Sequence, residues 1–251
     1  MTPEPMALTE WKVARLTALQ AEDGWLNLCD RVEIPSGAQS VGAAAENDVV
    51  LSTGPDFLGV VDVAARTFTL PNGAKLGFAK SAGGFAQVRV MPFLLELHGA
   101  DGQIALRLRD LRLPRIADLR YFPYKPEWVI RAKWQALPKP LAKSIDQKGG
   151  ATTQVHLTHI AEFRHAGQSI TLLATHWKGN EPMFVIRDKT SGVETYAASR
   201  FLIGEDIWEN KITLDFNRAF HPPCSFTDFA ICPLPPRENI LPFRIDAGER
   251  Y

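Results

Sequence analysis

Short runs of alternating apolar and polar residues follow one another along most of the chain, and one early segment departs from this pattern. There Trp11, Leu16 and Leu19 recur at helical spacing, and Thr9 just before them is a residue type that caps helices. The segment is therefore predicted to form an amphipathic helix of about three turns. Gly24 ends it, because glycine readily takes the left-handed conformation in which helices stop.

From residue 23 to about residue 112 the alternating runs are short and are separated by Gly, Pro, Asn and Asp. Pro71-Asn72-Gly73 predicts a hairpin, since Asn-Gly supplies the positive φ angles of a tight turn. The run from His98 to Gly102 indicates a second hairpin. Strands at this spacing are typical of antiparallel sheets in a sandwich or a barrel.

A proline-rich junction at residues 112–126 leads into a second series of strands. Leu137–Pro140 and Lys148–Gly150 are expected to bracket an exposed loop. The strongest strand candidates after this loop are Val155–Arg164, Ser169–Thr175, Met183–Asp188, Thr195–Leu202 and Lys211–Phe216.

Together these patterns predict a mostly β protein with an N-terminal helix followed by two antiparallel β units. The helix lies within residues 1–22, a sandwich-like first unit within 23–112, and a barrel-like second unit within 113–251. The sequence leaves open whether the two units are separate domains.

The charges of the chain balance, because 28 of its 251 residues are Lys or Arg and 28 are Asp or Glu. Nucleic-acid binders draw much of their affinity from a positive excess, so we expect no nucleic-acid partner. The N-terminus lacks the pattern of a secretory signal, and no stretch approaches the roughly 18 apolar residues of a membrane span. With only three cysteines, the chain is predicted to be soluble and cytoplasmic, with reduced thiols and no membrane partner.

The proline-rich segment from Leu214 to Pro236 is the strongest candidate for a functional site. Its five prolines exclude a helix and stiffen an irregular loop of the kind that holds binding or catalytic groups. The segment carries the side chains of Asp215, Asn217, Arg218, His221, Cys224 and Cys232.

If Lys211–Phe216 is a strand, Asp215 points away from the core and Arg218 lies at the strand exit. Arg218 and the amide of Asn217 would then bind a carboxylate or phosphate of a ligand. Asp215 would orient Arg218 or act as a base. A structural role stays open, in which Arg218 satisfies loop carbonyls and Asp215 satisfies loop amides.

The two cysteines of this segment fit a zinc site poorly, because seven residues separate them where zinc ligands usually have a short spacer. We therefore expect no metal, and the lack of a glycine-rich phosphate loop gives no reason to expect a cofactor. Buried apolar thiols are the simplest interpretation, and a disulfide is disfavoured in a reducing compartment. A nucleophilic Cys224 would need a nearby base and a lowered pKa.

Several motifs of the C-terminal half belong together. They are Arg200-Phe201-Leu202, Leu214–Ala219, Pro222–Cys224, Cys232–Pro236, Asn239 and Ala247-Gly248-Glu249. This combination resembles the bacterial and archaeal family known as domain of unknown function 1684, which has no assigned activity. The resemblance runs from Trp25 to the C-terminal tail, and it implies Arg200 as a further member of the site. It disfavours His221, because the family typically has Tyr-Asn where this chain has Phe220-His221.

We therefore expect a small-molecule site in the Asp215–Cys232 loop, with Arg200 and Arg218 as donors to an anionic or carbonyl ligand. Asn217 and Cys232 complete the ligand-binding set. One alternative is a hydrolase or transferase that uses Asp215 as base or Cys224 as nucleophile. Another is a structural or partner-binding β protein. The sequence indicates neither the ligand nor the oligomeric state.

Overall fold

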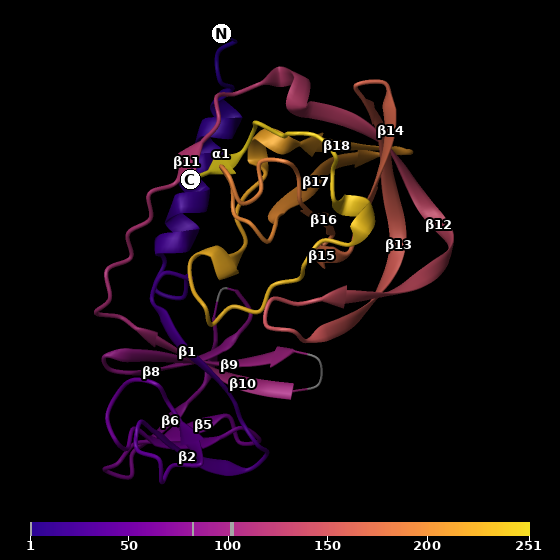
Figure 1. Ribbon diagram of the computed structural model, residues 1–251. Coiled ribbons are helices and arrows are strands. Elements are labelled where there is room, and N and C mark those ends of the chain that lie inside the picture. The colour runs from indigo at the N-terminus through magenta and orange to yellow at the C-terminus, as the bar shows by residue number, and fades with distance from the viewer. Residues whose placement is uncertain (1, 82, 101–102) are drawn as a thin grey trace. The chain divides into compact units, whose positions relative to one another are not determined.

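The computed structural model describes residues 2–81, 83–100 and 103–251, and the chain divides into two compact units. The large unit consists of Met1–Leu16 and Asp118–Tyr251, and the small unit is Thr17–Ala117. The chain is mostly β with one N-terminal α-helix and several antiparallel sheets (Figure 1), which confirms the expected fold class. Both units contribute strands to that result.

The helix α1 spans Met6–Gln20 and begins earlier than expected. The amide of Thr9, the expected cap, donates to the carbonyl of Pro5 (3.3 Å), so Thr9 already lies inside the first turn. Trp11 packs edge-on against Tyr121, with 6.3 Å between ring centroids, and fixes the first half of α1 to the large unit. None of the helices in the described part of the chain is long and apolar enough to span a membrane.

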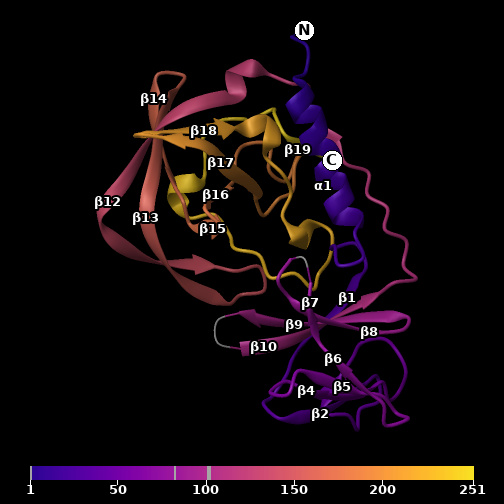
Figure 2. The same ribbon diagram turned by 180° about the vertical axis from the view of Figure 1, so that it is seen from behind.

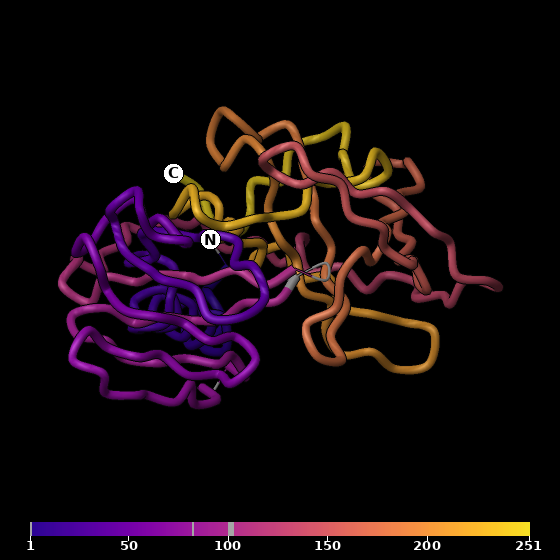
Figure 3. The backbone as a smooth tube through the Cα atoms, turned by 90° about the horizontal axis from the view of Figure 1, so that it is seen from below, coloured from indigo at the N-terminus to yellow at the C-terminus, as the bar shows by residue number. Residues whose placement is uncertain are grey.

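The small unit contains two five-stranded sheets, ordered β1-β10-β9-β8-β7 and β3-β2-β4-β5-β6. Apolar side chains from both sheets, Leu95 and Phe68 among them, form one core, as expected for a sandwich. The stacked hairpins are visible as indigo to magenta loops in Figure 3. The strands are β1 (Leu28–Glu33), β2 (Ala38–Gly42), β3 (Val49–Val50), β4 (Gly59–Asp62), β5 (Thr67–Thr69), β6 (Lys75–Gly77), β7 (Ala79–Lys80), β8 (Ala86–Val90), β9 (Phe93–Ala100) and β10 (Gln103–Asp110).

Two hairpins were expected in this unit. The first is confirmed, because β5 and β6 pair across Pro71-Asn72-Gly73 and Gly73 has a φ of 83°. For the second, β9 and β10 pair from Ala100 and Gln103 onward. Residues 101 and 102 of the expected turn lie outside the described residues.

The large unit is organised around an antiparallel seven-stranded sheet of order β14-β13-β12-β18-β17-β16-β15 (Figure 2). Its strands are β12 (Val129–Asp146), β13 (Thr152–His165), β14 (Gln168–Leu173), β15 (His176–Lys178), β16 (Glu181–Ile186), β17 (Arg200–Trp208) and β18 (Lys211–Asp215). Among the described residues none of the sheets closes into a barrel, so the barrel-like form expected for residues 113–251 is corrected. The edge strands β14 and β15 follow each other in sequence, but each pairs only with its inner neighbour.

Asn239 connects strands near the two open edges of this sheet. Its side-chain oxygen accepts from the amide of Leu173 in β14 (2.8 Å), and its nitrogen donates to the carbonyl of Leu173 (3.0 Å). The same nitrogen donates to the carbonyl of Val185 in β16 (2.9 Å). The amide of Asn239 thus occupies the place where a further strand would pair.

The exposed loop expected between Leu137–Pro140 and Lys148–Gly150 is mostly strand, because β12 continues through Leu137–Pro140 to Asp146, and the chain turns only at Lys148–Gly150. The pairing of β12 with β13 shifts register between Ala136 and Leu141, which lets two prolines pass without donating to the ladder. The strand expected at Thr195–Leu202 begins only at Arg200, because the residues before it form the turns that follow Asp188.

The large unit also contains short elements, two of them before β12 and the others in the irregular segment after β18. The remaining elements are β11 (Arg120–Tyr121), which pairs with β19 (Glu249–Arg250), and the 3-10 helices η1 (Pro126–Trp128), η2 (Phe216–Arg218), η3 (Pro223–Ser225) and η4 (Arg237–Asn239). Phe216, Ala219, Leu241, Ile245 and Ala247 from this segment are buried in the core of the large unit. The start of the candidate loop is therefore anchored by Phe216 and Ala219, and the segment after the loop by Leu241, Ile245 and Ala247.

Candidate functional site

Asp215 and Asn217 fix the point at which the chain leaves β18. The Asp215 carboxylate caps η2 by accepting from the backbone amide and the side-chain amide of Asn217, both at 3.0 Å. Asn217 in turn pairs with the backbone of Lys125, accepting from its amide (3.0 Å) and donating to its carbonyl (2.9 Å). Asn217 is buried, and its side-chain oxygen and nitrogen both have partners within the protein. These contacts tie the strand exit to the chain before η1.

Arg218 lies beside this corner and is engaged by two carboxylates. One guanidinium nitrogen contacts both oxygens of Glu205 at 2.8 Å, and Nε lies 3.5 Å from Asp215. The Arg218 side chain is 23% exposed. It therefore reaches solvent, but its charge is already balanced by neighbours on β17 and β18.

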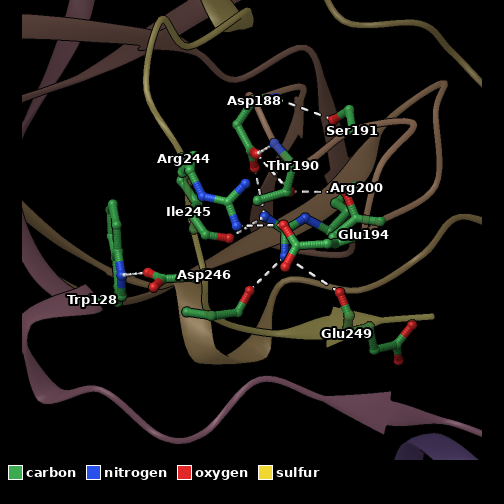
Figure 4. Close-up of polar contacts among 12 residues, drawn as sticks. Trp128, Asp188, Thr190, Ser191, Glu194, Arg200, Arg244, Ile245, Asp246 and Glu249 are labelled. Atoms are coloured by element: carbon green, nitrogen blue, oxygen red, sulfur yellow. Dashed lines mark hydrogen bonds and ion pairs between the residues drawn. The ribbon is translucent and has the colours of Figure 1, made fainter.

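Arg200, at the start of β17, is 1% exposed and lies at the centre of a buried network (Figure 4). Its Nη2 donates to Asp188 (2.5 Å) and to the carbonyl of Ile245 (2.9 Å). Its Nη1 donates to the carbonyl of Ala247 and, at 3.4 Å, to that of Glu249. Both terminal nitrogens of Arg200 thus hold the C-terminal segment against β17.

Asp188, the acidic partner of Arg200, accepts several further hydrogen bonds. Asp188 accepts from the backbone amide and the hydroxyl of Thr190, each at 2.6 Å, in addition to Arg200. Close by, the indole of Trp128 donates to Asp246 (3.1 Å; Figure 4). The Asp188–Arg200 pair is therefore surrounded by hydrogen bonds, as a buried ion pair requires.

Cys224 and Cys232 form a second, separate centre at the far end of the loop. The backbone amide of Cys224, in η3, points at the sulfur of Cys232 (3.3 Å). Both cysteines are free thiols and buried, Cys224 with 4% exposure. Cys232 is held in place because its carbonyl accepts from the amide of Lys148 (2.9 Å).

Lys148, in the turn after β12, and Tyr196, in the irregular segment before β17, both reach Cys224. The Lys148 ammonium donates to the carbonyl of Cys224 (3.1 Å), and so does the Tyr196 hydroxyl (2.9 Å). The hydrogen bond from the Cys232 thiol, aided by Tyr196 and the charge of Lys148, lowers the pKa of Cys224 to about 7, although burial opposes the shift. The same thiol–thiol bond, with burial, raises the pKa of Cys232. Because one pKa is lowered and the other raised, Cys224 is the thiol of the pair that ionises first.

His221 connects this centre to the first helix. Its Nε2 accepts from the amide of Tyr196 (3.2 Å), and its own amide donates to Glu249 (2.7 Å). Arg15 of α1 binds both groups, donating to Glu249 (2.8 Å) and to the carbonyl of His221 (2.8 Å). Burial, together with the charges of Arg200 and Arg15, lowers the pKa of His221 to about 4, so this imidazole is neutral at neutral pH.

The structure divides the expected site residues among three places. Asp215, Asn217 and Arg218 meet at the strand exit, Arg200 belongs to the buried ion pair, and Cys224 meets Cys232. Sequence reasoning missed Lys148 and Tyr196 beside Cys224. The glycines after Lys148 marked a turn, but no pattern connects Tyr196 with a thiol almost thirty residues later. Within residues 2–81, 83–100 and 103–251, no group of three or more His, Cys, Asp or Glu side chains is placed to hold a metal ion.

Comparison with known proteins identifies the family. The family model described as "Protein of unknown function (DUF1684)" matches residues 115–250, which is more than half of the chain. The chain belongs to this family. The part of the DUF1684 chain that matches contains all six expected site residues; the expected extension of the resemblance back to Trp25 stays a prediction.

Among solved structures, the DUF1684 chain is similar to the solution NMR structure of an uncharacterised protein from Haloarcula marismortui. The two are 29% identical, with a TM-score of 0.44, over 53% of this chain and 76% of the archaeal one. No curated protein matches the DUF1684 chain. The match to the family model shows the family, and neither comparison gives an activity.

Proposed function

We propose that the protein binds a small anionic or carbonyl ligand at the Cys224 end of the Asp215–Cys232 loop. In this proposal Cys224 attacks the ligand as a thiolate. The observation that carries the proposal is the group of polar side chains gathered at Cys224. The Cys232 thiol lies beside its sulfur, and the Tyr196 hydroxyl and the Lys148 ammonium both donate to its carbonyl. A thiolate is the nucleophilic form of cysteine, and a thiol with a pKa of about 7 is half ionised at neutral pH.

The roles of the other groups follow from their exposure and contacts. The Lys148 side chain is 36% exposed and pairs at 3.4 Å with Asp228, whose side chain is 96% exposed. Because this surface ion pair is solvated, an anionic group of the ligand can replace Asp228 while Lys148 remains next to Cys224. When the ligand is an ester or another acyl compound, the thiolate adds to its carbonyl carbon, the bond from this carbon to the leaving group breaks, and a thioester forms. The leaving group then takes up a proton from water. Water then hydrolyses the thioester, or another nucleophile accepts the acyl group. Cys224 is nearly covered, which favours a small ligand over a polymeric one.

The strand exit with Arg218 and the buried ion pair of Arg200 are less suitable places for a ligand. Both terminal nitrogens of Arg200 donate to groups of the protein, and Arg218 is engaged by Glu205 and Asp215. An anionic ligand at either arginine would have to displace internal partners. Ligand binding by Arg200 and Arg218, and Asp215 as a base, stay predictions.

The test is thiol labelling with iodoacetamide between pH 5 and 10, with each cysteine followed by mass spectrometry. Cys224 should react with a midpoint of about 7, whereas Cys29 is an internal control because burial raises its pKa to about 11. Cys232→Ala should move the Cys224 midpoint toward higher pH, since the largest favourable contribution to the low pKa is lost. The labelling is done under reducing conditions, because the proposal requires the thiols of a cytoplasmic protein.

A second measurement separates reactivity from catalysis. The parent should release p-nitrophenolate from p-nitrophenyl acetate in a burst, and Cys224→Ser and Lys148→Gln should remove or weaken it. Cys29→Ser is the matched control and should leave the burst unchanged. The proposal fails if Cys224 does not react in the folded protein at pH 8, or if it titrates like an ordinary thiol.

A further inference from the structure

The small unit contains a pocket that the Cys224 centre does not involve. Its volume is about 510 Å³, within the roughly 300–1,000 Å³ of small-molecule sites. The side chains that matter for its chemistry are Arg66, Phe78, Lys80, Phe85, Leu97 and Ile104. All of them belong to the small unit, so the pocket is complete within that unit.

Both sheets of the small unit contribute to the walls. Arg66 comes from the turn between β4 and β5, in one sheet. Lys80, Leu97 and Ile104 come from β7, β9 and β10 of the other sheet. Phe85 lies directly before β8. The pocket therefore depends on the packing of the two sheets rather than on one mobile loop.

The lining is positively charged. It contains Arg66 and Lys80 but no carboxylate, although the chain as a whole is neutral. Among the described residues, neither cation forms an ion pair. The nearest acid before Arg66 in the chain, Asp62, accepts instead from the amide of Ala65 (2.9 Å). Two cations without counter-ions in the lining of one pocket attract an anion.

The rest of the lining is apolar and partly aromatic. Phe85 is 41% exposed and Ile104 is 37% exposed, so both would lose water contact when a ligand covers them. Phe78 and Leu97 are half-buried and extend the same apolar surface. Aromatic rings favour stacked or edge-on contact with another ring. The lining thus offers an apolar surface for a ring beside a wall that attracts negative charge.

We propose that this pocket binds an aromatic carboxylate, with its ring against Phe78 and Phe85 and its carboxylate at Arg66 and Lys80. Guanidinium matches the geometry of a carboxylate in a two-pronged contact, and the Lys80 ammonium adds a second charge. The site lies in the small unit and is independent of the reaction proposed for Cys224 in the large unit.

The test is a titration with 2-naphthoate, followed by the amide signals of Gly84 and Gly99, which line the pocket. The neutral analogue 2-naphthalenemethanol supplies the same ring without the charge, and inorganic phosphate supplies charge without the ring. We expect naphthoate to shift both amides and to bind at least about ten-fold more tightly than either analogue.

Two variants test the cations without disturbing the fold. Arg66 has a φ of 52°, a conformation that glycine adopts without strain, so Arg66→Gly removes the charge at no conformational cost. Lys80→Gln removes the other charge, and Lys211→Gln, an exposed lysine of the large unit, is its matched control. Each pocket variant should weaken naphthoate binding by about five-fold, and the control should not.

Three results would overturn the proposal. In one, naphthoate leaves Gly84 and Gly99 unshifted. In another, the neutral alcohol or phosphate binds as tightly as naphthoate, which removes the need for a charged ring. In the third, Arg66→Gly and Lys80→Gln bind naphthoate as well as the Lys211→Gln control does.

Discussion

Replacing Arg200 by methionine tests whether the buried network of the large unit is structural. Arg200 and Asp188 are each 1% exposed in their side chains and are joined at 2.5 Å. Removing one partner of such a pair leaves a buried charge and costs about 3–5 kcal/mol. The carbonyl of Ile245 also loses a donor, for about 1 kcal/mol more. We therefore expect Arg200→Met to lower the free energy of unfolding by about 5 kcal/mol.

The assay is equilibrium unfolding in urea, followed by tryptophan fluorescence from Trp128 and Trp134 in the core of the large unit. Arg218→Met is the matched control, since its side chain is 23% exposed and its ion pairs are partly solvated. That change should cost about 1 kcal/mol or less. Adding Asp188→Asn to Arg200→Met should restore part of the stability, because it removes the unpaired charge.

Two outcomes would refute this reasoning. One is a loss for Arg200→Met no larger than that for Arg218→Met, which would mean that the carbonyls and Asp188 find other partners. The other is a double variant whose loss equals the sum of the single losses, which would mean that Arg200 and Asp188 do not act as a pair.

Two further predictions concern stability. His221 stays neutral in the folded protein down to about pH 4, whereas in the unfolded chain it is protonated below about pH 6.5. Between these pH values the unfolded state binds more protons than the folded state. The free energy of unfolding therefore falls as the pH falls. Urea unfolding should show that the free energy of unfolding of the parent is lower at pH 4.5 than at pH 7 by up to about 3 kcal/mol. This loss should be smaller in His221→Gln, and equal losses in the two proteins would contradict the prediction. Gly248→Ala should lower the melting temperature strongly, because Gly248 has a φ of 82° and an added Cβ would lie 2.4 Å from the carbonyl oxygen of Ala219. Gly149→Ala is its control, with a φ of 108° and open space around it, and an equal effect of both substitutions would show that only φ matters.

Local patterns predicted what depends on local physics. The Asn72-Gly73 turn and the mostly β class follow from turn chemistry and from alternation, and both are confirmed. The family could be recognised because most of its motifs are short runs of residues that are neighbours in the chain. Prolines were misleading in β12, where a register shift lets the strand pass through them. That shift depends on the pairing with β13, which proline content alone does not reveal.

The assignment of roles within the site could not be made from sequence for a different reason. Arg200 was found through a motif, but two of its acceptors are the backbone carbonyls of Ile245 and Ala247. Backbone acceptors carry no side-chain signature, so a buried structural arginine and a ligand-binding arginine look alike in sequence. Cys224 shows the converse case, since Lys148 and Tyr196 lie far from it in sequence, outside the strands, and only the fold brings them to its carbonyl.

Asn239 has a consequence that concerns association between chains. The carbonyls and amides along an unpaired sheet edge are a template to which strands of other molecules can add. By pairing with Leu173 and Val185, the side chain of Asn239 occupies such groups on β14 and β16 without extending the sheet. The backbone groups of Leu173 and Val185 that Asn239 occupies are therefore not available to a strand of another chain.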